Sequence, residues 1–174
     1  ICGPDGKNWL SPGENPREDA KFLTMICALM QAVDTHADLL RASVASARND
    51  HRLGANEAPP AIVSIFLGEE LTDVIAQLEK GESRQKNGTA TLHVGVSSLP
   101  RLAKDMTDRN RTSPFAFTGN KFEFRAVGSN QSCALPMTIL NTIVAESLDQ
   151  ICTRIEAETG KGAAFNDALQ KVLS

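Results

Sequence analysis

The feature of this sequence that most constrains its fold is a change of hydrophobic period along the chain. Apolar residues recur every three or four positions in 15–34 and again in 136–155, which is typical of helices that bury one face. Between these segments, the β-branched run 61–67 and the alternating run 121–126 have the patterns of strands. We therefore expect a mixture of helices and strands, in which each apolar stripe needs a partner surface.

End signals bound the expected helices. Asn15, Pro16 and Glu18 form a capping sequence, so a helix should run from there to about residue 34. Gly81 is typical of a residue that follows a helix end. The other expected helices are a short one through 39–44, a surface helix over 69–80, a long one with Pro136 in its first turn, and a last amphipathic piece over 165–173.

Three segments are expected to be strands. The run 61–67 is expected to be buried, 91–96 is a short candidate, and 121–126 alternates between apolar and charged residues. By contrast, 97–120 has no hydrophobic period and contains two prolines and a dense charge cluster. We therefore expect a long structured loop there, and such loops often carry function.

Composition argues against several classes of partner and site. Lys and Arg number 18 and Asp and Glu 21, a net charge of -3, so no bulk positive field would hold nucleic acid. The longest apolar run, around 22–30, has about half the length of a membrane span, so no membrane segment is expected. The four cysteines lack a CxxC spacing, which argues against zinc and favours a reducing cytoplasm. Because Ile1 opens the chain without a leader and the last amphipathic piece stops abruptly at Ser174, we expect a fragment truncated at both ends.

The segment 121–126 carries the most informative chemistry. Because side chains alternate along a strand, Lys121, Glu123 and Arg125 should form one row while the apolar residues face the core. In one interpretation this row is a solvated strand face whose charges offset each other and add little stability. In the other, the carboxylate binds Mg²⁺ and the flanking cations hold anionic groups of a substrate.

Other cations add to this row. A cluster of cations repels itself unless an anion joins it, and arginine binds carboxylate and phosphate through two parallel hydrogen bonds. The concentration of positive charge in one part of an acidic chain therefore predicts an anion site. The five cations are Arg101, Arg109, Arg111, Lys121 and Arg125.

Three segments together resemble a known family. The polar, Gly-containing segment 49–60, which by composition alone is an ordinary loop, resembles glutamine synthetases of the bacterial type III class, as do 108–115 and 119–126. Their order and separation match, and the resemblance covers about residues 8–174. It implies that 1–174 is the C-terminal portion of a single glutamine synthetase catalytic domain, of α+β class, with an antiparallel sheet and flanking helices.

The resemblance implies an ATP-dependent glutamate–ammonia ligase. Such an enzyme phosphorylates the side-chain carboxylate of L-glutamate with ATP, and ammonia from ammonium then displaces the phosphate. It also implies Mg²⁺ or Mn²⁺ as the metal and a cytoplasmic, ring-shaped homo-oligomer, expected to be a dodecamer. Because further metal ligands of the family would lie upstream of Ile1, the chain alone is expected to be inactive.

On the predicted strand 121–126, the resemblance implies a role for each charged residue. Glu123 resembles a ligand of the metal that bridges the ATP phosphates and glutamate. Arg125 resembles a contact to glutamate, and Lys121 stands where most relatives have an arginine near the nucleotide phosphates. Ala116 is a departure, because it stands where a second nucleotide-contacting arginine is expected.

Upstream residues complete the implied site. Arg52 resembles a loop arginine that contacts glutamate, and Glu57 resembles the flap glutamate that covers the site and helps bind and deprotonate ammonium. Arg111 resembles the arginine that touches the transferring phosphate and the substrate. These roles agree with the chemistry, because phosphoryl transfer depends mainly on positioning and charge neutralisation, and a flap excludes water.

Two other functions fit the same residues. A ligase of the same fold could join glutamate to an amine other than ammonia, and the ammonium-side residue Glu57 argues against it. A non-catalytic subunit or binding module could keep the fold without the reaction. The joint presence of Glu57, Arg111, Glu123 and Arg125 argues against that second alternative.

Overall fold

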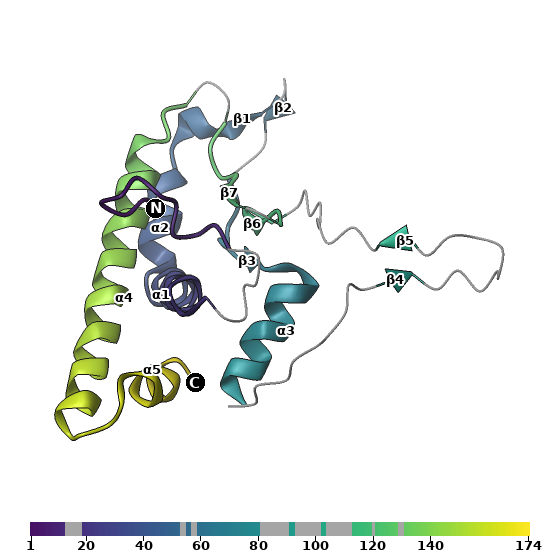
Figure 1. Ribbon diagram of the computed structural model, residues 1–174. Helices are drawn as coiled ribbons and strands as arrows, with labels where there is room; N and C mark the ends of the chain where they lie inside the picture. The colour runs from purple at the N-terminus through teal and green to yellow at the C-terminus, as the bar shows by residue number, and fades with distance from the viewer. Residues whose placement is uncertain are drawn as a thin grey trace.

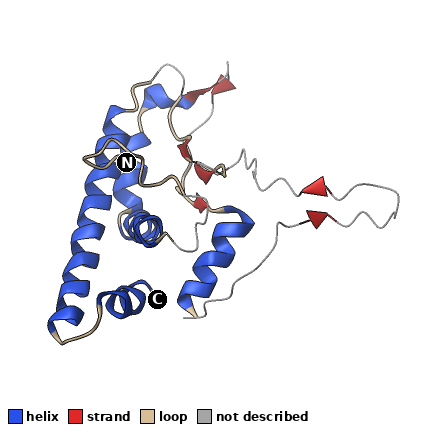
Figure 2. Ribbon diagram, in the orientation of Figure 1, coloured by secondary structure: helices blue, strands red, loops and turns tan. Residues whose placement is uncertain are grey.

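The computed structural model describes residues 1–12, 19–52, 55–56, 59–80, 91–92, 102–103, 113–119, 121–128 and 131–174. At 51–52, 55–56, 91–92 and 102–103 only the backbone is described. Helices α1 (Ala20–Thr35) and α2 (Ala37–Val44) pack against the long helix α4 (Ala134–Gly160), which runs along the outside of the molecule (Figure 1). These three helices lie beside a small sheet, as the colouring by secondary structure in Figure 2 shows.

Local periodicity predicted most helices correctly. Helices α2, α3 (Gly68–Glu79) and α5 (Phe165–Leu173) lie where the sequence patterns predicted them. The stripe expected on α4 is buried, with Pro136 in the first turn and only Leu148 half-buried. None of the helices in the described ranges combines the length and the apolar character needed to cross a bilayer.

Helix α1 is capped by a residue that the sequence analysis did not single out. The carboxylate of Asp19 accepts a hydrogen bond from the Phe22 N–H at 3.0 Å, which satisfies a donor at the helix N-terminus. The capping sequence predicted at 15–18 lies outside the described residues. The end of the helix at Thr35 agrees with the predicted end near residue 34.

The sheet has three strands in the order β3 (Ile65–Phe66), β6 (Phe115–Phe117), β7 (Phe122–Phe124). Strand β3 pairs with β6 in parallel, and β6 pairs with β7 in antiparallel orientation. The sheet is therefore mixed, and the expectation of an antiparallel sheet was wrong for the β3–β6 pair. The described part of the chain thus combines helices with a small sheet.

The central strand β6 was missed, because it lies in the segment 97–120 that was expected to be a loop. Its three residues, Phe115, Ala116 and Phe117, are all buried. A strand that is buried on both faces has no alternation of apolar and polar residues, so a search for a period of two does not detect it.

Strand β3 is shorter than the run 61–67 from which it was predicted. Pairing begins at Ile65 because its partner on β6 is Phe115, the first residue of that strand. Before this point the chain has no ladder partner in the described residues, and Ile62 is 76% exposed. The expectation that the whole run is buried was therefore wrong.

Two further pairs of short strands are antiparallel. Strand β1 (His51–Arg52) pairs with β2 (Ala55–Asn56), with Arg52 opposite Ala55. Strand β4 (Thr91–Leu92) pairs with β5 (Leu102–Ala103). The rest of the predicted strand 91–96 lies outside the described residues.

The core explains why α1 is buried on more than the single predicted stripe. One part of the helix packs with α4 and the N-terminal segment, and another packs with Leu71 of α3 and Phe117 of β6. Within the predicted stripe, Ala20 is exposed and Cys27 and Met30 are half-buried. The buried residues of α1 are Phe22, Leu23, Met25, Ile26, Ala28, Leu29, Ala32 and Val33.

Candidate active site on strand β7

The charged row predicted on β7 is present. One charged residue lies in the middle of the strand, and one lies directly before it and one directly after it. Glu123 lies opposite Ala116 of β6, and Ala116 is fully buried. Lys121 precedes the strand and Arg125 follows it, and the Lys121, Glu123 and Arg125 side chains are 59%, 38% and 29% exposed. The row therefore lies on the partly exposed face of the sheet.

Glu123 contacts both neighbouring cations. The Arg125 Nε and Nη2 groups donate hydrogen bonds to Glu123 Oε2 at 3.0 and 2.7 Å. The Lys121 Nζ lies 3.5 Å from the other oxygen, Oε1, which is a looser contact. Both prongs of the arginine thus converge on one carboxylate oxygen, while the second oxygen is held mainly by charge.

These contacts hold the pKa of the Glu123 carboxyl below its usual value. The largest cause is the hydrogen bond from Arg125, and the positive charges of Arg125 and Lys121 act in the same direction against the opposing effect of burial. The carboxylate therefore stays ionised well below neutral pH. It can accept hydrogen bonds or bind a cation without first losing a proton.

The backbone positions this row at both ends. The Arg125 N–H donates to the Pro114 carbonyl oxygen at 2.6 Å, which extends the pairing of β6 with β7 past the last strand residue. At the other end, the Thr118 N–H donates to the Lys121 carbonyl oxygen at 2.8 Å, and Gly119 adopts a positive φ of 93° in the turn. The two cations are thus placed by the hairpin itself.

An aromatic layer supports the opposite face of β7. The ring of Phe115 lies 5.5 Å from that of Phe122 and 5.6 Å from that of Phe124, both edge-on, and the rings of Phe117 and Phe122 lie 5.1 Å apart. Such pairs stabilise a fold beyond the burial of their area. The prediction that Phe122 and Phe124 pack toward the core is confirmed.

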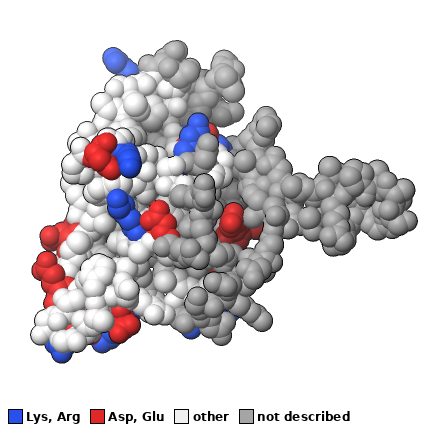
Figure 3. All heavy atoms as spheres, viewed as in Figure 1, with Lys and Arg blue, Asp and Glu red and all other residues white. Residues whose placement is uncertain are grey.

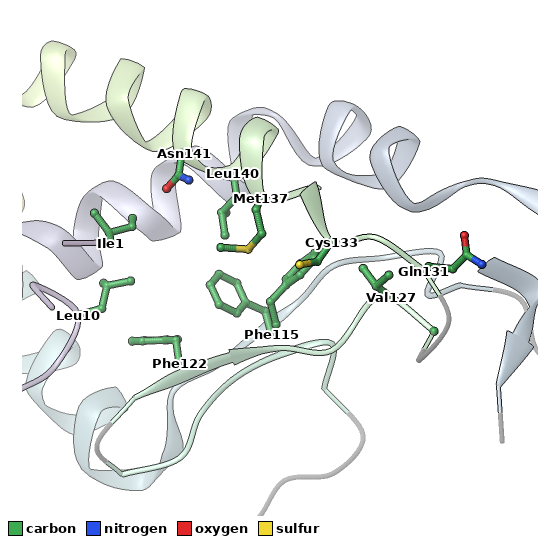
Figure 4. A pocket seen from close by; sticks show the side chains of 12 residues that line it. Ile1, Leu10, Phe115, Phe122, Val127, Gln131, Cys133, Met137, Leu140 and Asn141 are labelled. Atoms are coloured by element: carbon green, nitrogen blue, oxygen red, sulfur yellow. The ribbon is translucent and has the colours of Figure 1, made fainter. Parts of the chain in front are cut away.

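A pocket of about 390 Å³ lies on this aromatic side, between the sheet and the start of α4 (Figure 4). Its walls are mainly apolar, and none of the three charged residues of the row lines it. The pocket and the charged row are therefore separate features of the structure. The lining residues are Ile1, Leu10, Phe115, Phe122, Phe124, Val127, Gly128, Gln131, Cys133, Met137, Leu140 and Asn141.

The other predicted site residues are only partly described. The backbone of Arg52 lies in β1, but its side chain is outside the description, as are Glu57 and Arg111. Arg101 and Arg109 also lie outside the described residues. The structure therefore brings together Lys121, Glu123 and Arg125, and the roles of all the site residues stay predictions.

Within the charged row, Glu123 is the carboxylate that a divalent cation could bind. Glu123 is ionised, has an oxygen that is only loosely held, and is partly exposed, so it fits the role of one hard oxygen ligand. In the ranges that the structure describes, no group of three or more His, Cys, Asp or Glu side chains could hold a metal. Further ligands would have to come from outside these ranges.

Figure 3 shows the charged side chains of the described residues on one face of the molecule. On the face shown in Figure 3, basic and acidic side chains of the described residues lie next to one another at several places. Arg101, Arg109 and Arg111, three of the five cations expected to accumulate, lie outside the described residues, so the accumulation of positive charge stays a prediction.

The residue that sequence analysis missed here is Asn49. Its side chain is only 2% exposed and is bonded to the segment that follows β7. Asn49 opens the polar segment 49–60, where polar residues are expected to be exposed, so nothing in the sequence pattern indicated that it is buried.

Comparison with known proteins gives the family context. No family model matches the chain. It is 54% identical over 171 residues to a type-3 glutamine synthetase of Dictyostelium discoideum, which covers 97% of this chain and 23% of that protein. It is 42% identical over 177 positions to a glutamine synthetase of Bacteroides fragilis (strain YCH46), covering 99% of this chain and 24% of the relative.

A glutamine synthetase of Butyrivibrio fibrisolvens is 54% identical over 123 residues, which are 71% of this chain and 17% of that protein. The chain thus spans less than a quarter of the length of these curated relatives. The resemblance that was inferred from its three motifs is confirmed.

Proposed function

Since this chain is homologous over nearly its whole length to a segment of type-3 glutamine synthetases, we propose that it forms part of the active site of an ATP-dependent glutamate–ammonia ligase. The segment 1–174 would be the C-terminal portion of the catalytic domain. The observation that carries the proposal is the ionised Glu123, which lies between Lys121 and Arg125 on one strand.

The row suits the first half of the reaction, in which the γ-phosphate of ATP moves to the side-chain carboxylate of glutamate. Both reactants are anions, so bringing them together requires positive charge at fixed positions. Arg125 would bind glutamate through its planar guanidinium group, and Lys121 would act as a point charge near the nucleotide phosphates. Both are held in place by the β6–β7 hairpin.

Glu123 would be one ligand of Mg²⁺ or Mn²⁺. Its Oε1 lies 3.5 Å from Lys121 Nζ, so this oxygen can bind a cation with little loss of existing contact, while Oε2 stays bonded to Arg125. When bound, the ion would neutralise charge on the phosphates and on glutamate. The remaining ligands would belong to parts of the protein outside this chain, so the chain alone is expected to be inactive.

Residues outside the row would contribute to both halves of the reaction. Arg52 would contact glutamate, Arg111 the transferring phosphate, and Glu57 would bind ammonium and take its proton so that ammonia can attack. A flap carrying Glu57 would also exclude water, which otherwise competes with ammonia for the acyl phosphate. We further propose that the whole protein works in the cytoplasm as a ring-shaped homo-oligomer, a dodecamer, as the resemblance implies.

The test uses the full-length protein that contains this segment. With ATP, L-glutamate, ammonium and Mg²⁺ it should form glutamine and release ADP and phosphate. The variant Glu123→Gln should lower turnover by about a hundredfold or more and raise the Mg²⁺ concentration needed for half-maximal activity, because an amide is a poor ligand for a hard cation.

The matched control is Glu156→Gln, which changes an exposed glutamate on α4 in the same way and should leave turnover and metal dependence unchanged. If Glu123→Gln behaves like this control, Glu123 is not a metal ligand. Turnover with another amine but not with ammonium would identify a different glutamate ligase, and no turnover with any amine would identify a non-catalytic subunit.

A further inference from the structure

The Asn49 side chain makes three hydrogen bonds from a buried position. Its Nδ2 donates to the backbone carbonyl oxygens of Val44 and Ala126, both at 2.9 Å. Its Oδ1 accepts a hydrogen bond from the Gly128 N–H at 2.7 Å. Among the described residues, Asn49 and Ser147 are the two buried polar side chains. One amide therefore joins the end of α2 to the segment after β7.

The chemistry of these contacts suits a carboxamide and no smaller or charged group. Two acceptors face the nitrogen and one donor faces the oxygen, which fixes the orientation of the amide. Aspartate would place an oxygen against two carbonyl oxygens. An apolar side chain would leave the Gly128 N–H without its hydrogen-bond acceptor. The contacts also join positions 77 and 79 residues apart in the sequence.

The two segments that Asn49 joins both lead to proposed substrate contacts. On one side, Ala126 directly follows Arg125, whose own N–H is bonded to Pro114. On the other side, hairpin β1–β2 begins two residues after Asn49, and Arg52 is the second residue of β1. Three residues of extended chain span at most about 11 Å, so the backbone of Arg52 is tethered close to the end of β7.

We propose that Asn49 is a positioning residue for the glutamate site. Its amide sets the position of the backbone of hairpin β1–β2, which includes Arg52, relative to Glu123 and Arg125. This inference rests on the proposed function, since it concerns how two glutamate-binding arginines are held at a set separation. Asn49 itself acts through these residues and through Ala126 and Gly128.

The test measures kinetic constants in the full-length protein. Asn49→Ala should raise KM for glutamate about tenfold and leave KM for ATP within about twofold, because small displacements of positioning groups cost large factors in rate or binding. Asn49→Ser also removes the contacts of the amide but leaves a hydroxyl instead of a methyl group in the buried site, so it should give a smaller rise. If Asn49→Ala does not fold, the same kinetic constants are measured on Asn49→Ser. In both variants the Gly128 amide should exchange with solvent faster than in the wild type.

The matched control is Gln31→Ala. Gln31 Nε2 donates to Gln150 Oε1 at 2.9 Å, so this amide also joins two elements, α1 and α4, but neither leads into the β1–β2 hairpin. Its loss should leave the ratio of the two KM values unchanged.

The outcomes separate the two claims. If the wild type makes glutamine but the Asn49 variants leave the KM ratio unchanged, as Gln31→Ala does, or raise both KM values equally, the positioning role is wrong and the proposed function stands. If the wild type makes no glutamine under any condition, the proposed function is overturned and the inference with it.

Discussion

Replacing Phe115 by alanine should remove the main support of the strand that carries the charged row. Phe115 is the first residue of the central strand β6, is 3% exposed, and contacts the rings of Phe122 and Phe124. Burying a phenylalanine side chain contributes about 1.5–3 kcal/mol, and each aromatic pair adds about 0.5–1.5 kcal/mol. The free energy of unfolding should therefore fall by about 3–5 kcal/mol, the usual range for this substitution in a core.

The cost should lie at the upper end of this range because the ring also lines the pocket beside α4. Removing it enlarges an existing cavity, and the surrounding strands are held by their ladder and cannot easily collapse into the space. Phe115→Leu keeps most of the volume and should cost about 1.5 kcal/mol or less.

Urea unfolding of the chain, followed by fluorescence, measures this loss. Trp9 is the one tryptophan in the sequence and packs against the cluster that contains Phe115, so its emission reports on this core. The matched control is Phe165→Ala on α5, where the ring is 61% exposed and the change should cost under about 1 kcal/mol. Equal losses for the Phe115 and Phe165 variants, with an unchanged dependence on urea concentration, would refute the assignment of Phe115 to the central support.

Three further predictions concern charge and protonation. In the full-length protein, Arg125→Lys keeps the charge but loses the two-pronged donor, so KM for glutamate should rise by about tenfold while KM for ATP changes less; equal losses for both substrates would indicate a disturbed strand instead. Glu158 accepts hydrogen bonds from Lys161 and Lys171, which lower its pKa to about 2. Because the folded-state pKa lies below the unfolded value, the contribution of Glu158 is fully present above pH 4.5 and is lost as the pH falls toward 2. Thermal unfolding midpoints of Glu158→Gln should therefore depend less on pH in this window than those of the wild type, and parallel curves would contradict the assignment. Burial raises the pKa of the Cys27 thiol to about 11, so at pH 8 iodoacetamide should modify it far more slowly than the three exposed cysteines; mass spectrometry that finds equal rates would show that the thiol is accessible.

The sequence by itself determined the elements whose signals are local. Helices α2, α3, α4 and α5 were predicted because apolar spacing and end residues act within a few turns of the same chain. The charged row on β7 was predicted for the same reason, since a period of two places Lys121, Glu123 and Arg125 on one face whatever the strand pairs with. The three motifs that carry the family resemblance are likewise properties of short segments.

The tertiary structure decided which segments pair and which polar side chains are buried. Strand β6 has no period of its own, and it became a strand because β3 and β7 satisfy its backbone on both sides. Because β3 pairs with β6 at two residues, Ile65 and Phe66, the observed strand is shorter than the predicted run 61–67. The burial of Asn49 also depends on distant contacts, because its hydrogen-bond partners Ala126 and Gly128 lie 77 and 79 residues away in the sequence. Contacts between distant segments form only when the whole chain has folded, and no local pattern contains them.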